Sequence, residues 1–177
     1  MTRIATRRLI LRPIEPGDLL PIASHINNFA VSQNLTRVVH PYFPDDFKRW
    51  DSRDKRHSHV FGITMTGDEV IGVVGLESDA VGAEAELGYW LAEAYWKQGL
   101  MGEAARAVME FGFGRAGYDR IVSGYKHGNE ASRRILNRLG FRHTGHKWAR
   151  SFALKRPVRI ATVELTRREG LRERAAK

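Results

Sequence analysis

The chain has 177 residues, close to the size of one ordinary domain, and 42% of them are hydrophobic, so a folded core can form without disulfides or metal. It contains no cysteine, which excludes a disulfide framework, a thiol nucleophile and a thiolate zinc site. The net charge of +9 is uneven, because residues 1–114 hold 12 Lys and Arg against 15 Asp and Glu, whereas residues 115–177 hold 17 against 5. The C-terminal part should therefore attract a phosphate-rich cofactor or nucleic acid, unless it is simply a solvated basic face.

No run of 18 or more apolar residues occurs, and the basic N-terminus lacks the apolar segment of a signal peptide. We therefore expect a soluble, cytoplasmic protein that has no membrane partner.

The first half of the chain predicts a strand, two helices and a pair of strands. Residues 7–14 put an apolar run before a proline, as in a strand that ends in a turn, and residues 18–28 carry apolar side chains at helical spacing. Residues 45–56 are polar and predict an exposed second helix. Residues 60–65 and 70–76 are β-branched or apolar runs with a turn-forming sequence between them, which is typical of two paired strands.

A strand and a long helix follow in the middle of the chain. Residues 84–91 predict the strand, in which Gly88 invites a bulge or the close approach of another molecule to the backbone. Apolar residues recur at helical spacing between 99 and 117, and Gly114 and Gly117 should end this helix. We expect the functional site to begin at this strand.

The last third of the chain predicts three more strands and one more helix. The expected elements are a strand, a helix capped by Asn129 and two further strands, at residues 121–125, 129–139, 141–149 and 157–166. Strands outnumber helices, and the two kinds are mixed along the chain. The sequence therefore predicts an α/β (α+β) fold in one domain over residues 1–166, followed by a charged, frayed tail at 167–177.

The most informative segment is residues 98–104 (QGLMGEA), where a short connection runs into the first turn of the long helix. Glycines at 99 and 102 let a ligand approach the main chain closely, and the unpaired N–H groups of a helix start favour an anion such as a pyrophosphate. The alternative is an ordinary helix start at which the glycines only turn the chain. No Lys-Ser or Lys-Thr pair follows the second glycine, so the segment is not a P-loop.

Residues 112–117 match the dinucleotide-binding pattern G-x-G-x-x-G letter for letter. That pattern must leave a strand and open a helix, whereas this segment is predicted to close a helix and precede a strand. We therefore interpret these glycines as the end of the long helix.

Five segments together resemble the GNAT superfamily of acetyltransferases, and within it the ribosomal-protein (RimJ/RimL-like) N-acetyltransferases. They are residues 8–12 (RLILR), 71–76 (IGVVGL), 86–91 (ELGYWL), 98–104 (QGLMGEA), and 129–132 (NEAS) with 139–141 (LGF). The resemblance covers about residues 6–166. It implies a GNAT fold, a mixed, twisted, mostly antiparallel sheet of about six or seven strands whose two central strands splay apart, flanked by about four helices.

The resemblance also implies how acetyl-coenzyme A (acetyl-CoA) is bound. The pantetheine arm would lie between the splayed strands, paired like an extra strand with the backbone of Tyr89, Trp90 and Leu91. The main-chain amides that would hold the pyrophosphate are those of Gln98, Gly99, Leu100, Met101, Gly102, Glu103 and Ala104. Asn129 would hydrogen-bond the pantetheine, or would serve only as a helix N-cap.

Glu86 is the candidate base for the proton that the acceptor ammonium must lose. It precedes the cofactor-binding part of its strand, and a glutamate at the matching position has this role in distant relatives. The alternative is a structural carboxylate that pairs with a neighbouring element. Glu77, at the end of the preceding strand, is the reserve candidate or an exposed loop residue. The ribosomal-protein branch can carry a carboxylate near position 151, where this chain has Ser151.

Ser132 is the candidate acid for the departing thiolate. Many superfamily members use a tyrosine in the helix after the asparagine, but the matching position here is Leu136. In the ribosomal-protein branch a serine three residues after the asparagine is implicated, and Ser132 stands there. The alternative is an ordinary first-turn helix serine. Much of the rate can in any case come from positioning the reactants.

Histidines and tryptophans have ordinary interpretations. The histidines lack a nearby cysteine or carboxylate that would complete a metal site, so we expect no metal at His57, His59, His143 and His146. The tryptophans are expected mainly in the core or in pocket walls, at positions 50, 90, 96 and 148.

The sequence thus predicts an acetyl-CoA-dependent N-acetyltransferase that acts on a primary amine, either a protein N-terminus or a small molecule. A protein N-terminus is favoured by the resemblance alone. Two alternatives stay open: a basic module that binds RNA or the ribosome with a degenerate catalytic site, as Leu136 and Ser151 suggest, and an acyltransferase that uses another acyl-CoA. Proximity to the ribosome and a homodimer are also left open.

Overall fold

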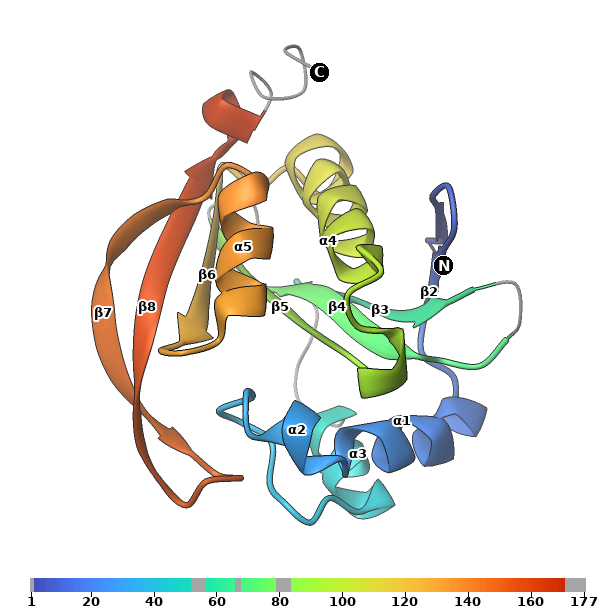
Figure 1. Cartoon of the computed structure of the whole chain (residues 1–177). Helices are drawn as coiled ribbons and strands as arrows, with labels where there is room; N and C mark the ends of the chain where they lie inside the picture. The colour runs from blue at the N-terminus through green and yellow to red at the C-terminus, as the bar shows by residue number, and fades with distance from the viewer. Residues whose placement is uncertain (1, 52–56, 66–67, 79–83, 171–177) are drawn as a thin grey trace.

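The computed structural model describes residues 2–51, 57–65, 68–78 and 84–170, which form one mixed sheet of eight strands. The strand order is β1-β2-β3-β4-β5-β6-β8-β7, and every pair of neighbours is antiparallel except β5 and β6 (Figure 1). The strands are β1 (Ile4–Ala5), β2 (Ile10–Arg12), β3 (His59–Thr64), β4 (Gly72–Glu77), β5 (Glu84–Leu91), β6 (Arg120–Lys126), β7 (Arg142–Ser151) and β8 (Arg156–Thr166). The predicted mixed sheet is confirmed, and the short β1 raises the number of its strands to eight.

Helices cover both faces of the sheet (Figure 1). One face carries α4 (Leu100–Phe111) and α5 (Glu130–Arg138), and the other carries α1 (Leu19–Ile26), α2 (Phe29–Ser32) and α3 (Pro44–Asp51). Short 3-10 turns at Pro16–Asp18 and Glu93–Tyr95 precede α1 and α4. Among the helices that the structure describes, none is long and apolar enough to cross a membrane.

Each face of the sheet has its own hydrophobic core. Leu100, Ala104 and Val108 recur along α4 at helical spacing and are fully buried against the sheet. On the other face, Ile22 and Ile26 of α1 are buried in a second cluster. Because successive residues of a strand point to opposite faces, the strands between these two layers must be apolar on both sides, and β4 is buried along almost its whole length.

The central strands β5 and β6 pair only where they begin. Residues 84–86 of β5 pair with residues 120–122 of β6. Beyond Glu86, β5 stays paired with β4 up to Leu91, whereas β6 stays paired with β8 up to Lys126. Each strand follows its outer neighbour, so the two separate, as the resemblance implied. The β4–β5 register is continuous through Gly88, so no bulge forms there.

The end of α4 explains the misleading glycine pattern. A π turn at Gly112–Ala116 extends the helix, and Gly117 ends it in the left-handed conformation, with φ +81°. The strand β6 follows, so the G-x-G-x-x-G match closes a helix and opens no nucleotide site, as predicted.

The two ends of the β7–β8 ribbon are both attached to the rest of the fold. At its tip, the Phe152 amide donates to the Thr36 carbonyl over 3.1 Å. After β8 the chain continues as a helical turn at residues 167–170, where the Glu169 carboxylate accepts from Thr166 and pairs with an Arg142 nitrogen 3.0 Å away. The predicted tail is therefore ordered over its first residues, and residues 171–177 lie outside the described part of the chain.

Candidate active site

A cleft of about 1450 Å³ opens where β5 and β6 separate. Its walls come from the second half of β5, the first turn of α4, β6, α5, the loop after α2 and the tip of the β7–β8 ribbon. Most of the predicted site residues line it, including Glu86, Tyr89, Gly102, Asn129 and Ser132. The structure thus brings the segments around Glu86, Gly99 and Asn129 to one place, whereas Gln98 and Ala104 do not line the cleft.

Beyond Glu86, the edge of β5 that faces the cleft has backbone groups that pair with no neighbouring strand among the described residues. The Ser123 hydroxyl of β6 donates to the Leu87 carbonyl over 2.8 Å, and the Trp96 indole N–H donates to the Leu91 carbonyl over 2.7 Å. Since backbone groups alternate between the two edges of a strand, Tyr89 faces the cleft together with Leu87 and Leu91, while the backbone of Trp90 faces β4. Of the three residues expected to pair with pantetheine, Tyr89 has the most accessible backbone.

The first turn of α4 forms a cradle of amides at one end of the cleft. Gly99 is the N-cap, in the left-handed conformation with φ +75°, and it offers no side chain to the first N–H groups of the helix. A Cβ placed on Gly102 would meet nothing within 4 Å, so the backbone there is open to a ligand. Lys97 and Arg106 line the same end of the cleft. This arrangement suits a pyrophosphate, because N–H groups, helix dipole and side-chain charge all favour an anion.

The side chain of Glu103 has a structural function. Its carboxylate accepts from the Thr6 hydroxyl over 2.7 Å and from the Arg8 amide and Nε over 2.8 and 2.7 Å, and Arg8 also donates to the Gln98 carbonyl over 2.9 Å. Burial alone would raise the pKa of Glu103, but these hydrogen bonds outweigh it and hold the pKa below its usual range. The N-terminal segment therefore fastens the loop before α4. The Glu103 amide donates to the Gly99 carbonyl over 3.2 Å, so the amides left for a ligand come earlier in the first turn.

A hydroxyl pair joins β5 to α5 across the cleft. The Tyr89 hydroxyl lies 2.8 Å from Ser132 Oγ, and the Asn129 side-chain oxygen accepts from the Ser132 amide over 3.1 Å. Burial raises the pKa of Tyr89 to about 12, while the bond to Ser132 opposes this rise, so the phenol stays protonated at neutral pH. Asn129 is thus the N-cap of α5, and its amide nitrogen remains as the group it could offer to a ligand.

Glu86 lies on the opposite face of β5 from Tyr89 and is paired with an arginine. Arg37 donates to the Glu86 carboxylate over 2.8 Å and to the Glu77 carboxylate over 3.2 Å. Glu77 and Glu86 are directly opposed on β4 and β5, so one guanidinium bridges two neighbouring carboxylates. All three side chains are partly exposed and line the cleft. Both candidate bases are therefore at the site, and each is held by the same cation.

The remaining candidate positions have structural functions. Leu136, at the position where many relatives have a tyrosine, is fully buried in the core beneath α5. Ser151 is also buried, and its hydroxyl accepts from the Leu154 amide over 3.2 Å in the β7–β8 turn. Sequence reasoning missed Arg37 and the Tyr89 side chain. Arg37 stands in a loop without a motif, and Tyr89 was assigned a backbone contact only.

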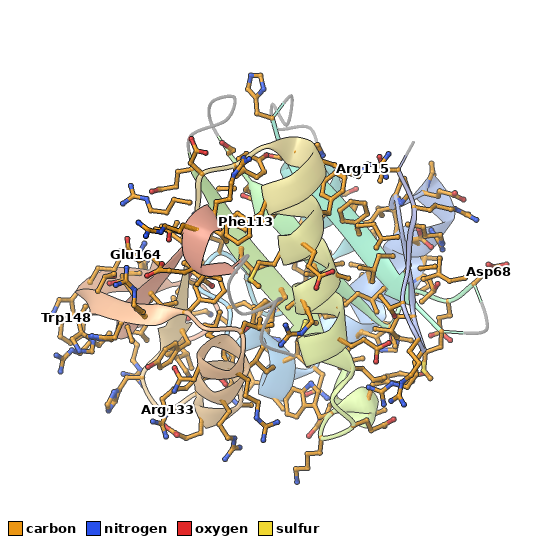
Figure 2. The ribbon with its side chains drawn as sticks, turned by 90° about the horizontal axis from the view of Figure 1, so that it is seen from above. Asp68, Phe113, Arg115, Arg133, Trp148 and Glu164 are labelled. Carbon is orange, nitrogen blue, oxygen red and sulfur yellow. The ribbon has the colours of Figure 1, made fainter. Side chains whose placement is uncertain are left out.

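The described residues contain no group of three side chains that could hold a metal ion. His59 packs edge-on against Phe111 with ring centroids 4.9 Å apart, and the rings of His143 and His146 lie 4.7 Å apart on β7. The expectation for the tryptophans was wrong for Trp148, which is 72% exposed on the outer part of the ribbon (Figure 2). Among the described residues, no helix packs closely against β7, the strand that carries Trp148.

Comparisons with known proteins agree with this geometry. The acetyltransferase (GNAT) domain family matches residues 8–142. The Bacillus subtilis (strain 168) protein named "Probable N-acetyltransferase YjcK" is 36% identical over 150 residues, which cover 78% of this chain and 83% of YjcK. The structure of spermidine N-acetyltransferase from Vibrio cholerae, in complex with CoA and spermine, is similar with a TM-score of 0.81 and 19% identity, over 94% of this chain and 99% of the other. RimL, a ribosomal L7/L12 alpha-N-protein acetyltransferase in complex with CoA, is similar with a TM-score of 0.77 and 20% identity, over 93% and 98%.

The two structural likenesses establish the fold, and the family match together with YjcK establishes the family. Acetyl-CoA is the donor that enzymes of this kind use, and the helix start, the open glycines and the uncovered edge of β5 fit it. The chain therefore belongs to the GNAT acetyltransferases.

Proposed function

We propose that residues 1–166 form one catalytic domain that transfers an acetyl group from acetyl-CoA to a primary amine. The observation that carries this proposal is the cleft between β5 and β6, which has a helix start without a side-chain cap at one end and the carboxylate of Glu86 at the other. A donor with a phosphate-rich tail and a cationic acceptor would meet between these two ends.

The donor end would be held mainly by backbone. The amides of the first turn of α4 would bind the pyrophosphate, with Lys97 and Arg106 nearby. The backbone of Tyr89 would pair with the pantetheine arm, and the Asn129 amide nitrogen would hydrogen-bond it. When bound, acetyl-CoA supplies an activated thioester, whose C–S bond breaks as the amine nitrogen forms the new amide bond.

The proton of the acceptor would pass to Glu86. The amine arrives as an ammonium ion at neutral pH, and it must lose a proton before its nitrogen can attack. In the structure, Arg37 is hydrogen-bonded to the Glu86 carboxylate. The acceptor ammonium would displace this guanidinium, and its proton would then pass to Glu86 directly or through water. Glu77, which Arg37 also contacts, is the reserve base on the same face of the sheet.

The departing sulfur would be met from the other face of β5. Ser132 and Tyr89 form the hydroxyl pair that lines the cleft there, and their shared hydrogen bond lets either oxygen donate. Because Tyr89 keeps its proton to high pH, the pair can donate a hydrogen bond to developing negative charge over the whole neutral range.

The test is a screen of amines and peptide N-termini with acetyl-CoA, in which free thiol is detected. The names of the two similar structures supply the two acceptor classes to include, a polyamine and a protein N-terminus. Thiol release that depends on an amine would support the proposal. Salt-dependent RNA binding without any thiol release would favour the alternative of a basic binding module. Thiol release only with a longer acyl-CoA would show that acetyl-CoA is not the donor.

A further inference from the structure

The wall of the cleft that faces Glu86 is basic. Lys126 of β6, Ile160 of β8 and Lys147 of β7 are successive Cα partners across three strands, so their side chains share one face of the sheet. Val122, four residues before Lys126, is the Cα partner of Glu86, which places Glu86 on that same face. Both lysines line the cleft. The two lysines and the Glu86 carboxylate therefore lie on the same side of the sheet and line the same cleft.

These cations have no acidic partner among the described residues. Residues 142–163, which include all of β7 and most of β8, contain no Asp or Glu. The nearest acid on β8, Glu164, pairs with Arg120 and Arg142 at the far end of the ribbon. Burial lowers the pKa of Lys126, and the positive charge of Arg156 lowers it further. An anion bound beside Lys126 would oppose both effects.

The tip of the ribbon closes this end of the cleft. The hydrogen bond from the Phe152 amide to the Thr36 carbonyl holds the tip against the loop that carries Arg37. Arg150 and Phe152 line the cleft beside it. An acceptor at this end is therefore enclosed between the carboxylates on β4 and β5, which already pair with Arg37 of the loop, and the lysines on β6 and β7.

We propose that the preferred acceptor is an amine that carries its own carboxylate close by, as in an acidic peptide N-terminus or a free amino acid. The ammonium would lie at Glu86 and Glu77, and the carboxylate would lie at Lys126 and Lys147. A polyamine, which has only positive charge, would meet repulsion at the lysine wall. This assignment rests on the proposed function, because it names the acceptor of the same site.

The test compares acceptors of equal length in the thiol-release assay. Three peptides begin with Ala and continue with Asp and Glu, with Asn and Gln, or with Lys, and spermidine and free glutamate complete the set. We expect kcat/KM for the acidic peptide or for glutamate to exceed that for the neutral peptide by about tenfold, the size expected of a partly exposed charged hydrogen bond. Added salt should reduce this ratio. The acidic peptide and glutamate show which source of the carboxylate fits.

The outcomes separate the two proposals. Equal rates for the three peptides, or a preference for spermidine, would overturn the assignment of the acceptor while leaving the acetyltransferase intact. Thiol release with none of these amines would contradict the proposed function and the assignment with it.

A charge reversal with a matched control locates the effect. Lys147 is exposed, so Lys147→Glu should fold normally, and it should lower kcat/KM for the acidic peptide about tenfold and raise that for the lysine peptide. Arg115→Glu changes the net charge equally but stands on the turn after α4, outside the cleft, and should leave the preference unchanged (Figure 2). The affinity for acetyl-CoA should stay the same in both variants. An unchanged preference in Lys147→Glu would overturn the assignment.

Discussion

The Tyr89 hydroxyl and Ser132 Oγ lie 2.8 Å apart and connect β5 to α5 at the point where β5 no longer pairs with β6. The bond bridges the cleft on the side of α4 and α5, while the Asn129 cap fixes the amide of the same serine. Two hydroxyls on different elements are therefore held together beside the expected path of the pantetheine arm. Their energetic coupling and their effect on the reaction can be measured together.

Removing one hydroxyl of this pair should cost more than removing both. Ser132→Ala leaves the Tyr89 hydroxyl without its partner, at a cost of about 1–3 kcal/mol in the free energy of unfolding, whereas replacing both groups by apolar ones is nearly neutral. Denaturant unfolding of Ser132→Ala, Tyr89→Phe and the double variant should therefore show strong non-additivity. The kcat of each variant should fall by at most about 10²-fold, the lower range of general-acid effects. Additive stabilities with unchanged kcat would show that the pair neither couples nor donates.

The pH–rate profile of Glu86→Gln should reveal the base. The amide is nearly isosteric but cannot accept the proton, so the rate should fall mainly below the pKa of the acceptor amine, and the difference should shrink at high pH. Affinity for acetyl-CoA should be nearly intact. Glu77→Gln is the matched control, because it removes a carboxylate from the same arginine bridge and should have the smaller effect. A normal profile for Glu86→Gln would leave positioning as the main source of catalysis.

Gly102→Val should weaken the binding of acetyl-CoA by about tenfold or more without unfolding the protein. Its side chain would enter open space at the first turn of α4, where the amides should meet the pyrophosphate. Gly114→Val is the matched control, since its Cβ also meets nothing within 4 Å but the residue lies outside the cleft. Calorimetric titration of both variants with acetyl-CoA gives the comparison. Equal affinities would mean that the phosphate site lies elsewhere.

Asp18→Asn should destabilise the fold by about 3–5 kcal/mol, because it leaves the buried Arg12 guanidinium without its counter-charge. The control is Asp119→Asn, whose carboxylate is 78% exposed, and its effect should stay within about 0.5 kcal/mol. Urea unfolding at neutral pH measures both.

The same ion pair predicts a loss of stability in acid. Burial alone would raise the pKa of Asp18, but the hydrogen bonds from Arg12 and the Glu15 amide outweigh it and hold the pKa below its usual value. A carboxylate with a lowered pKa in the folded state stabilises the protein above its unfolded pKa, about 3.9, and this contribution disappears as the pH falls through the folded pKa. Below about pH 4 the stability of the wild type should therefore fall more steeply than that of Asp18→Asn. Parallel curves would contradict this assignment.

Local patterns in the sequence were sufficient for most of the fold. The periods of 2 and 3.6 in the apolar residues and the helix-ending glycines identified β5, α4 and α5 within a few residues, because these elements obey local rules. The separation of β5 from β6 depends on which neighbour each strand pairs with, and only the resemblance supplied it. The exposure of Trp148 depends on whether a helix packs against β7, which no local pattern records.

The part of the candidate site that consists of main-chain groups could be predicted from the sequence. Glycines at 99 and 102 predict an anion site from the sequence alone, and both glycines line the cleft. The side-chain contacts were not predictable in the same way. Arg37 and Glu86 are 49 positions apart, and Tyr89 and Ser132 are 43 apart, so each pair is brought together only by the packing of distant elements.

The measurement that tests the central claim most directly is the product balance with the best acceptor found in the screen. Wild-type protein, acetyl-CoA and the amine are incubated together. Free thiol is titrated, and the N-acetylated amine is quantified by mass spectrometry. We predict equal amounts of free thiol and of N-acetylated amine, both reduced at limiting acetyl-CoA in Gly102→Val and unchanged in Gly114→Val. Acetyl-CoA that binds in the cleft without any amine becoming acetylated would contradict the account.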